Sequence, residues 1–325
     1  MVLLANPKYA AMVMDARSGE ILHSENANKR LHPASLTKMM TLYVVFQAVE
    51  NGEISLDKKV KISRHAASEP PSKLGLRPGQ KVRLRYLIRA AAIKSANDAA
   101  TALGEAIEGS EAAFARRMNR TAKAMGMNRT TFKNAHGLTE SGHLSTARDM
   151  TILGRHLFYD FPDYYHLFAR KTAAAGSKKV RNTNRRFLSN YRGADGIKTG
   201  YTRAAGYNLV ASANRNGERI ITTVFGGRST TTRNAQVAKL MNLGFKKAPR
   251  NVKLQKPKPP SYIAIAKAYP VINLSKSLRP KIRPENNTDN NLIAVNEFKS
   301  DILSALKLAQ AEDNPPENPS EEYTN

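Results

Sequence analysis

Ser35 and Lys38 have the residue types and the spacing of a nucleophile and its base. Residues three positions apart share one face of a helix, so the Lys38 amine would lie one turn from the Ser35 hydroxyl. A Ser at the start of a helix also faces backbone N–H groups, which stabilise developing negative charge. Burial would lower the pKa of Lys38 and let the neutral amine accept the hydroxyl proton. The pair therefore predicts acyl transfer through Ser35 without a histidine.

Ser95 and Asn97 form a second polar pair. The Ser95 hydroxyl could relay a proton to a leaving group, and the Asn97 amide could hold a substrate carbonyl. This pattern is weak by itself, because two other Ser residues have an Asn two positions later and a turn or a helix cap would explain each. The S-x-x-K pattern also occurs at Ser55 and Ser304, neither of which begins a long apolar helix.

The tripeptide K-T-G that begins at Lys198 occurs once in the chain. Lys198 offers a cation and Thr199 a hydroxyl, while Gly200 would let a substrate backbone approach closely. If this segment is an edge strand beside the nucleophile, the N–H groups of Tyr201 and Ser35 would form an oxyanion hole. The motifs S-x-x-K, S-x-N and K-T-G, in this order, are the motif set of penicillin-binding proteins and class A β-lactamases.

Hydrophobic patterns predict the elements that must position these groups. The run from Leu36 to Val49 is apolar on nearly every face, as expected for a helix buried inside a domain. The helical run from Tyr86 to Ile107 is interrupted near Ser95, and Asn216-Gly217 is the strongest hairpin signal. We expect an α/β fold of the α+β type, with an antiparallel sheet from both ends of the catalytic domain, flanking helices and an inserted helical subdomain. Strands are expected at 9–15, 21–26, 207–213 and 220–225, and further helices at 111–125, 146–170 and 232–245.

The chain resembles the D-alanyl-D-alanine carboxypeptidases, which are low-molecular-weight penicillin-binding proteins of the β-lactamase and transpeptidase-like family. The resemblance implies the fold of that family and covers roughly residues 6–247. Besides the three motifs, it rests on segments 6–11, 74–76, 95–100, 136–138, 145–150 and 193–202.

This resemblance implies a serine-type hydrolase that removes the terminal D-alanine from the stem pentapeptides of peptidoglycan, in cell-wall biosynthesis and remodelling. Ser35 would attack the carbonyl between the two D-alanines, with Lys38 as base and Ser95 as proton donor to the leaving D-alanine. Penicillin and other β-lactams would mimic the D-Ala-D-Ala end and stall as an ester on Ser35. The substrate-binding residues would be Asn97 on the acyl group, Lys198 and Thr199 on the terminal carboxylate, and Gly200 and Tyr201 beside them.

The chain is strongly basic. It has 52 Lys and Arg residues against 26 Asp and Glu residues, a formal net charge of +26. Such an excess attracts polyanions, namely nucleic acid, anionic lipid headgroups or an anionic wall polymer, although solubility alone also accounts for it. No nucleic-acid-binding motif accompanies the charge, and the aromatic residues, 7% of the chain, form no stacking pattern. We expect no nucleic-acid partner, and a peripheral association with the membrane surface is a consistent consequence of the charge.

Composition divides the chain into three parts. Residues 1–5 resemble the end of a signal peptide, and residues 6–250 would form the catalytic domain. Residues 251–325 are rich in Pro, and we expect a largely disordered tail with an amphipathic helix at 297–309. The chain contains no Cys, which suits an oxidising compartment. Together with the resemblance, this predicts the periplasm or cell envelope, with the export signal missing or truncated in this chain.

Three alternatives follow from the same residues. A class A β-lactamase would need a carboxylate in an E-x-x-L-N setting, which is absent between Asn97 and Lys198, and Glu140 lacks that context. An inactive wall-binding relative is disfavoured because the nucleophile, the base and K-T-G are all present. A metal enzyme is disfavoured because the seven His residues are scattered, and His136 and His143 lack zinc-site spacing. We therefore expect no metal and no cofactor, and a structural hydrogen-bonding role for His136.

Overall fold

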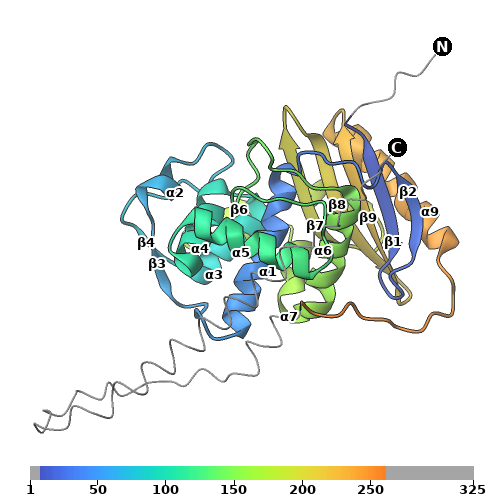
Figure 1. The fold of residues 1–325 in the computed structure, drawn as a ribbon, viewed down its shortest axis with the longest axis horizontal. Coiled ribbons are helices and arrows are strands. Elements are labelled where there is room, and N and C mark those ends of the chain that lie inside the picture. The colour runs from blue at the N-terminus through green and yellow to red at the C-terminus, as the bar shows by residue number, and fades with distance from the viewer. Residues whose placement is uncertain (1–7, 261–325) are drawn as a thin grey trace, which may run out of the picture. The chain divides into compact units, whose positions relative to one another are not determined.

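The computed structural model describes residues 8–260 of the chain. Its centre is a five-stranded antiparallel sheet with the strand order β2-β1-β9-β8-β7 (Figure 1). Ala10 pairs with Phe225, so the first strand of the domain lies beside β9, the strand that precedes the last helix. This confirms the predicted sheet built from both ends of the domain. The strands are β1 (Ala10–Asp15), β2 (Ile21–Glu25), β7 (Ala194–Thr202), β8 (Gly206–Arg215) and β9 (Glu218–Gly227).

Helices cover both faces of this sheet. α9 (Thr230–Lys247) packs on one face and α6 (Ala147–Asp160) on the other (Figure 1). Neighbouring residues of one strand therefore enter different cores: Val13 packs in the cluster that includes Met241 of α9, whereas Met12 belongs to the larger core on the α6 side. A strand covered on both faces needs apolar residues at every position, and all six residues of β1 are buried.

The inserted helical region surrounds a central helix, α1 (Thr37–Glu50). Every residue from 37 to 48 is buried, which confirms the prediction of a helix enclosed by the domain. The second predicted run is also interrupted as expected, because the helical path ends at Ser95 and resumes two residues later. The other elements of this region are α2 (Arg64–Ser68), α3 (Leu84–Arg89), the π-helical turn η2 (Ala90–Lys94), α4 (Asn97–Glu108) and α5 (Glu111–Ala124).

The Asn216-Gly217 turn joins β8 to β9, as its sequence predicts. Both residues have positive φ, 50° for Asn216 and 85° for Gly217, which is the left-handed conformation that a tight two-residue hairpin requires. The hairpin sets the register of the two longest strands of the sheet, with Arg215 opposite Glu218. The turn residues thus fix the register of β8, the strand that neighbours β7.

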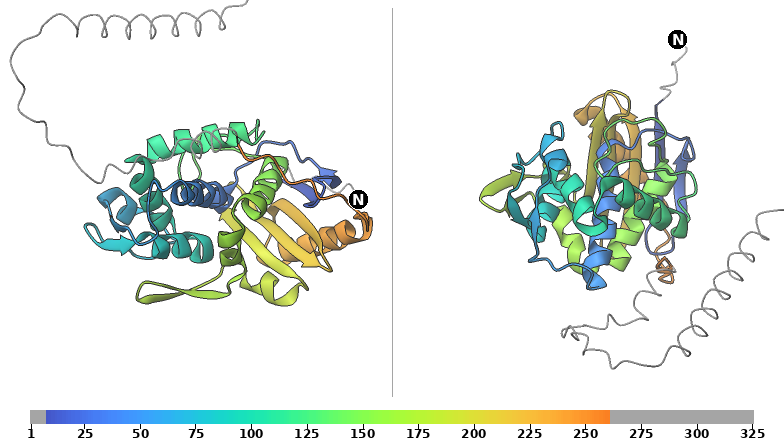
Figure 2. Two further views of the ribbon diagram at one scale, coloured as in Figure 1. Left: turned by 90° about the horizontal axis from the view of Figure 1, so that it is seen from below. Right: turned by 60° about the vertical axis from the view of Figure 1, so that its left-hand side comes forward.

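Short elements escaped the sequence patterns. One small antiparallel pair, β3 with β4, lies in the chain between α1 and α3, and a second pair, β5 with β6, precedes β7. Each of these strands has three or four residues, too few to show alternation. Figure 2 shows the second pair as a yellow-green hairpin that projects beside the helices. The short elements that the patterns missed are β3 (Lys59–Lys61), β4 (Lys81–Arg83), β5 (Thr172–Ala175), β6 (Lys178–Arg181) and α8 (Arg185–Asn190). Two further short helices, α7 (Pro162–Tyr165) and η3 (His166–Ala169), lie inside the helical stretch expected at 146–170.

After α9 the chain runs back along the domain without regular secondary structure up to residue 260. The Gln255 N–H donates a hydrogen bond of 2.8 Å to the Arg17 carbonyl, and the Arg17 guanidinium donates one of 2.7 Å to the Pro249 carbonyl. The expected disordered tail from residue 251 stays a prediction, because the helix expected at 297–309 lies outside the described residues. The signal-like residues 1–5 also lie outside them. Among residues 8–260, no helix has the length and hydropathy that a membrane crossing requires.

Candidate active site

Ser35 lies in the 3-10 turn η1 (Ala34–Leu36), which leads directly into α1. The turn is tightly constrained, because Ala34 has a φ of +50° and the backbone of Gly137 packs against its carbonyl. The Ser35 side chain is half-buried and lines a cleft. The start of the buried helix therefore presents one hydroxyl to solvent from a rigid support.

Lys38 lies one turn further along α1 and is fully buried. Its Nζ is 3.1 Å from Ser35 Oγ, and it donates hydrogen bonds of 2.7 Å to Asn97 Oδ1 and to the His136 carbonyl. Burial, and then the neighbouring charge of Lys198, hold the pKa of Lys38 well below its usual range. A neutral amine uses its two N–H groups on these two carbonyls, so its lone pair faces the Ser35 hydroxyl. The predicted nucleophile and base are thus in contact.

Ser95 and Asn97 reach the same cleft from the break between η2 and α4. Ser95 has a φ of +65°, a left-handed conformation that is strained for a residue other than glycine. Asn97 begins α4, and its Nδ2 donates a hydrogen bond of 2.9 Å to the Pro70 carbonyl, which fixes the orientation of the amide. The helix break therefore places the two polar groups that the sequence pattern singled out.

β7 carries the K-T-G motif and is the edge strand of the sheet, as expected. The Lys198 Nζ is buried and donates a hydrogen bond of 2.8 Å to Ser95 Oγ. Burial, and then the charge of Arg233, lower the pKa of Lys198 to about 7. The Thr199 hydroxyl donates a hydrogen bond of 2.7 Å to Thr183 Oγ1. Lys198 therefore connects the edge strand to the helical side of the cleft.

Gly200 is the point at which β7 approaches the nucleophile most tightly. A Cβ atom added there would lie 2.8 Å from the Pro33 carbonyl oxygen and 3.2 Å from the Ser35 nitrogen. Only a residue without a side chain allows the strand to pass so close to the start of the helix. The next residue, Tyr201, lines the cleft, is 56% exposed, and has its ring beside the Tyr207 ring.

The cleft has a volume of about 360 Å³. Six of the eight predicted site residues line it, while Lys38 and Lys198 are buried directly behind it. Among the described residues, no Asp or Glu side chain lines this cleft. Glu140 points elsewhere, since its Oε2 accepts a hydrogen bond of 3.0 Å from Asn134. The lining residues are Ser35, Pro71, Ser72, Ser95, Asn97, Gly137, Leu138, Thr183, Thr199, Gly200, Tyr201, Thr202, Tyr207, Thr230 and Arg233.

Arg233 is a functional candidate that the sequence patterns did not reveal. It lies in the second turn of α9, is 3% exposed, and borders the cleft near Thr230. Burial lowers the pKa of its guanidinium to about 10, which leaves it charged at neutral pH. Its Nη1 donates a hydrogen bond of 3.2 Å to the Asn208 carbonyl. An Arg in an ordinary helix carries no motif, so only the packing of α9 on the sheet identifies it.

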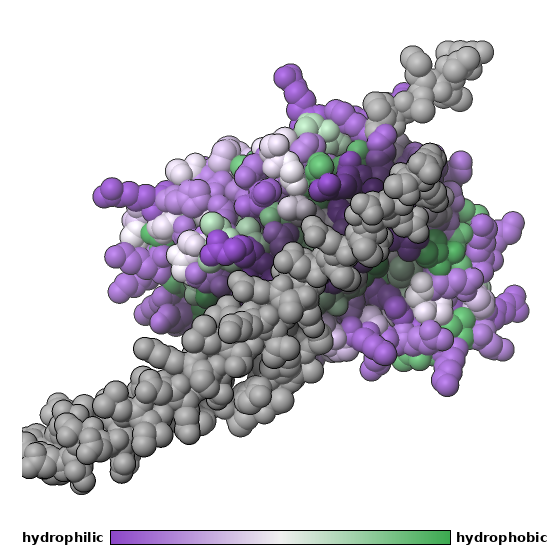
Figure 3. Space-filling view, in the orientation of Figure 1, coloured by the Kyte–Doolittle hydropathy of each residue, from purple (hydrophilic) through white to green (hydrophobic). Residues whose placement is uncertain are grey.

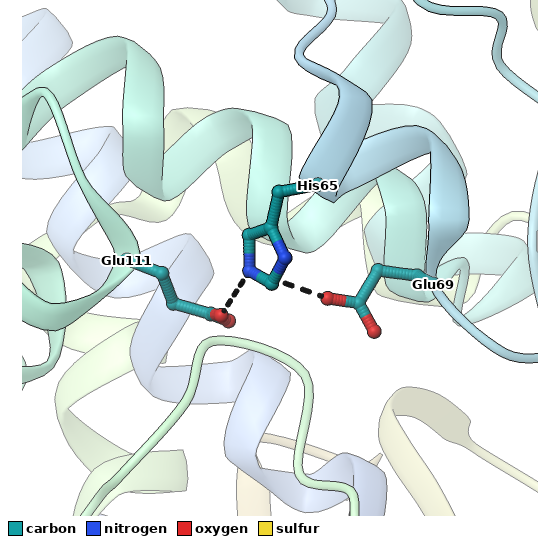
Figure 4. A group of neighbouring side chains, drawn as sticks. All are labelled: His65, Glu69 and Glu111. Atoms are coloured by element: carbon teal, nitrogen blue, oxygen red, sulfur yellow. Dashed lines mark hydrogen bonds and ion pairs between the residues drawn. The ribbon is translucent and has the colours of Figure 1, made fainter.

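A cluster of His65, Glu69 and Glu111 is the group of described residues that could hold a metal ion (Figure 4). Its three ligand atoms lie within 4.8 Å of one another. Hydrogen bonds already occupy them: His65 Nε2 is 2.9 Å from Glu111 Oε2, and Glu69 Oε1 accepts one of 2.9 Å from Thr101. The Nε2 of His136 lies 3.3 Å from Glu69 Oε1. We assign the cluster to the support of His136, whose carbonyl accepts from Lys38, and the absence of a metal stays a prediction.

Comparison with known proteins identifies the family of this chain. The family model described as D-alanyl-D-alanine carboxypeptidase matches residues 7–229. The chain is 41% identical over 249 residues to the D-alanyl-D-alanine carboxypeptidase DacF of Bacillus subtilis, a match that covers 74% of this chain and 63% of the relative. The chain therefore spans less than two thirds of the length of that relative.

Solved structures show the same fold. Penicillin binding protein 5 from Haemophilus influenzae is 37% identical with a TM-score of 0.70, covering 73% of this chain and 70% of that one. Penicillin-binding protein D2 from Listeria monocytogenes, solved in an ampicillin-bound form, is 35% identical with a TM-score of 0.68 and covers 75% and 99%. The α+β fold expected from the resemblance is confirmed. This chain belongs to the D-alanyl-D-alanine carboxypeptidase family.

Proposed function

We propose that this chain is a serine-type D-alanyl-D-alanine carboxypeptidase. It removes the terminal D-alanine from peptidoglycan stem pentapeptides in cell-wall biosynthesis and remodelling, and it is acylated by β-lactam antibiotics. The observation that carries the proposal is the placement of the buried Lys38 amine within hydrogen-bonding distance of both Ser35 Oγ and Asn97 Oδ1. The Listeria relative, solved with ampicillin, supports the assignment to penicillin-binding chemistry.

In the acylation step, Ser35 Oγ attacks the carbonyl carbon of the penultimate D-alanine while the neutral Lys38 amine takes the hydroxyl proton. The N–H groups of Ser35 and Tyr201 stabilise the negative charge that develops on the carbonyl oxygen. Asn97 orients the acyl group. Lowering the pKa of Lys38 matters because a protonated amine could not accept the proton.

The tetrahedral adduct then collapses. The C–N bond breaks, the Ser95 hydroxyl gives its proton to the departing amine, and the proton that Lys38 took from Ser35 returns to the site to restore the Ser95 hydroxyl. Lys198, Thr199 and the newly identified Arg233 hold the carboxylate of the leaving D-alanine. Water next attacks the ester on Ser35, and release of the shortened stem peptide regenerates the free hydroxyl.

A β-lactamase is the second candidate for the same motifs. Fast hydrolysis of a penicilloyl ester needs a base for the attacking water, which class A enzymes supply as a carboxylate. No carboxylate lines this cleft among residues 8–260. This favours a long-lived penicilloyl ester and hence a penicillin-binding carboxypeptidase.

The test is acylation by a penicillin, followed by intact mass spectrometry. We expect one penicilloyl adduct on the parent and none on Ser35→Ala. Ser55→Ala is the matched control, because Ser55 and Lys58 share the S-x-x-K pattern outside the cleft, and this variant should label like the parent. D-alanine release from a stem pentapeptide then tests the physiological reaction. Rapid turnover of the penicillin would instead establish a β-lactamase.

The cell envelope is the compartment that this substrate requires, and in a Gram-negative cell this is the periplasm. The charge of +26 further supports a peripheral, electrostatic association with anionic membrane surfaces. Hydrophilic residues dominate the coloured surface that is visible in Figure 3. Sedimentation with anionic vesicles should therefore fall as salt is added, and retention that ignores salt would contradict this association.

A further inference from the structure

Asp98 is a buried carboxylate that the proposed mechanism does not use. It directly follows Asn97 in the first turn of α4 and is fully buried. Among residues 8–260, no Lys, Arg or His side chain lies within 4.0 Å of its oxygens. Burying a carboxylate without a cation is costly unless hydrogen bonds replace the lost water. The groups that donate to Asp98 therefore indicate its role in the fold.

Four backbone N–H groups donate to this carboxylate. Oδ1 accepts from Leu74 at 2.9 Å and from Ala99 at 2.8 Å, while Oδ2 accepts from Gly75 at 2.8 Å and from Leu76 at 3.0 Å. Three of the four donors are consecutive residues. Gly75, in the middle, has a φ of +81°, and a left-handed residue turns successive N–H groups toward one anion. The segment 74–76 is therefore closed around the side chain of Asp98.

The loop that contains this segment also forms part of the wall of the active-site cleft, which Pro71 and Ser72 line. Residues 69–77 have no regular secondary structure, so hydrogen bonds to α4 set their position. The Asn97 N–H donates one of 2.7 Å to the Ser72 carbonyl, and the Asn97 Nδ2 donates one of 2.9 Å to the Pro70 carbonyl. Asn97 thus holds residues 70–72, and Asp98 holds residues 74–76.

The position of this loop sets the orientation of the Asn97 amide. Its Oδ1 accepts a hydrogen bond of 2.7 Å from Lys38, and the Pro70 carbonyl accepts one of the two N–H groups of its Nδ2. The second N–H is left for the carbonyl of the acyl group. If the loop moved away from α4, the amide would turn, and its contacts with the base and with the acyl group would be lost together.

We infer that Asp98 is a positioning residue for the acylation step: its carboxylate holds the loop 70–76 against α4 and thereby fixes the Asn97 amide between Lys38 and the acyl group. Asp98 does not line the cleft and touches none of the reacting groups. The inference rests on the proposed function and adds to it a residue that acts through Asn97.

The charge of Asp98 also reaches the base, which a purely structural residue would not affect. Burial and the charge of Lys198 lower the pKa of Lys38, while the carboxylates of Glu69 and Asp98 raise it by smaller amounts. Removing the charge of Asp98 should therefore lower the pKa of Lys38 further. Acylation needs the neutral amine, so the fall of the acylation rate at low pH should then move to lower pH.

Asp98→Asn tests the inference. Both oxygens of Asp98 accept from N–H groups, so the NH2 of an Asn would face a backbone N–H whichever way the amide turned. We expect faster amide hydrogen exchange in a peptide that covers residues 70–76. The limiting rate of penicillin acylation, measured by stopped flow over a range of pH, should fall by about 10–100-fold, since a misplacement of about 1 Å can cost the latter. The low-pH fall of the rate should move to lower pH.

Asp149→Asn is the matched control. Asp149 also lies in the first turn of a helix, is 2% exposed, and accepts a backbone hydrogen bond of 3.1 Å, from the Arg129 N–H. Its charge does not act on Lys38. The control should lose stability, yet keep the parent's exchange at 70–76, its acylation rate and its pH profile.

A second pair of variants separates the position of the loop from the charge. Gly75→Ala keeps the carboxylate of Asp98 but strains the left-handed residue that lies over it. We expect faster exchange at 70–76 and slower acylation, with the low-pH fall in place. Gly79→Ala is matched in conformation, with a φ of +78° and no atom within 4 Å of the added Cβ, and should acylate like the parent. This pair decides the question if Asp98→Asn does not fold.

Acylation at the parent rate in folded Asp98→Asn, or in Gly75→Ala if Asp98→Asn is unfolded, would overturn the inference. An equal loss of rate in Asp98→Asn and Asp149→Asn would also overturn it, because that result indicates general destabilisation. So would a low-pH fall that stays in place in Asp98→Asn, since a carboxylate that only supports the fold slows acylation equally at every pH. No acylation of the parent protein would instead overturn the proposed function, and this inference with it.

Discussion

The Lys38 Nζ and the Asn97 Oδ1 lie 2.7 Å apart, although 59 positions separate the two residues in the chain. The contact joins the start of α1 to the start of α4 and places the proposed base between Ser35, the proposed nucleophile, and Asn97, the proposed acyl-orienting group. The His136 carbonyl completes this arrangement from a third segment. In the proposed mechanism, catalysis therefore depends on how three separate segments hold one amine.

Replacing the base should remove acylation while the fold persists. Lys38→Met keeps the length and apolar stem of the side chain, and we expect the second-order rate of penicillin acylation to fall by about 10²–10⁴-fold, the usual contribution of a general base. Stopped-flow labelling with a fluorescent penicillin measures this rate, and circular dichroism reports folding. Lys58→Met, at the exposed S-x-x-K pattern, should acylate at the parent rate.

The acid limb of the pH profile of acylation, where the rate falls at low pH, should follow the protonation of Lys38. Acylation needs the neutral amine, so its rate falls as the pH falls through the pKa of Lys38. Burial and the charge of Lys198 lower the pKa of Lys38, and the negative charge of Glu69 raises it by a smaller amount. Burial alone would raise the pKa of Glu69, but the hydrogen bond and charge of His136, together with the Thr101 hydrogen bond and the charge of His65, lower it, so the carboxylate is charged.

Glu69→Gln should therefore lower the pKa of Lys38 further and move the acid limb to lower pH. The measurement is the acylation rate constant as a function of pH. Glu25→Gln, an exposed change on β2, is the control and should leave the limb in place. Movement of the limb to higher pH in Glu69→Gln would contradict this electrostatic account.

The alkaline limb should follow Lys198, whose pKa is about 7. The cationic form binds the substrate carboxylate, so acylation should decline as the pH rises through this value. Arg233 lowers the pKa of Lys198 by like-charge repulsion, and Arg233→Gln should raise that pKa and move the alkaline limb to higher pH. The absolute acylation rate of Arg233→Gln also falls, because a group that binds the carboxylate is lost. The pH at which the alkaline limb lies reports the pKa of Lys198 separately from this loss of binding. The exposed Arg228→Gln should not shift the limb.

Gly137 should prove essential to the position of the nucleophile. It has a φ of +88°, and an added Cβ would lie 1.9 Å from the Ala34 carbonyl oxygen, in the turn that carries Ser35. Gly137→Ala should lower the melting temperature strongly and slow acylation, because the backbone of the turn must move. Gly52→Ala is matched in conformation, with a φ of +74° and no atom within 4 Å of the added Cβ. It should cost only about 1–2 kcal/mol of strain and leave acylation unchanged.

Several elements could be predicted because their signals are local. The apolar run of α1, the break at Ser95 and the Asn216-Gly217 turn each depend on residues close together in the chain. The short hairpins carry no such pattern, since strands of three or four residues form where neighbouring helices and loops place them. Arg233 was missed for a related reason: its helix was predicted, but its burial against the cleft depends on packing.

The sequence alone determined the chemistry available to this protein: the order of the three motifs, the helix that begins beside Ser35, and an excess of basic residues without a single thiol. Tertiary structure decided the rest. The contact of Lys198 with Ser95 spans 103 positions, and the lowered pKa values of Lys38 and Lys198 arise first from burial. Distances between remote atoms and the loss of water around a charge are properties of the packed domain, and no segment of the chain has them by itself.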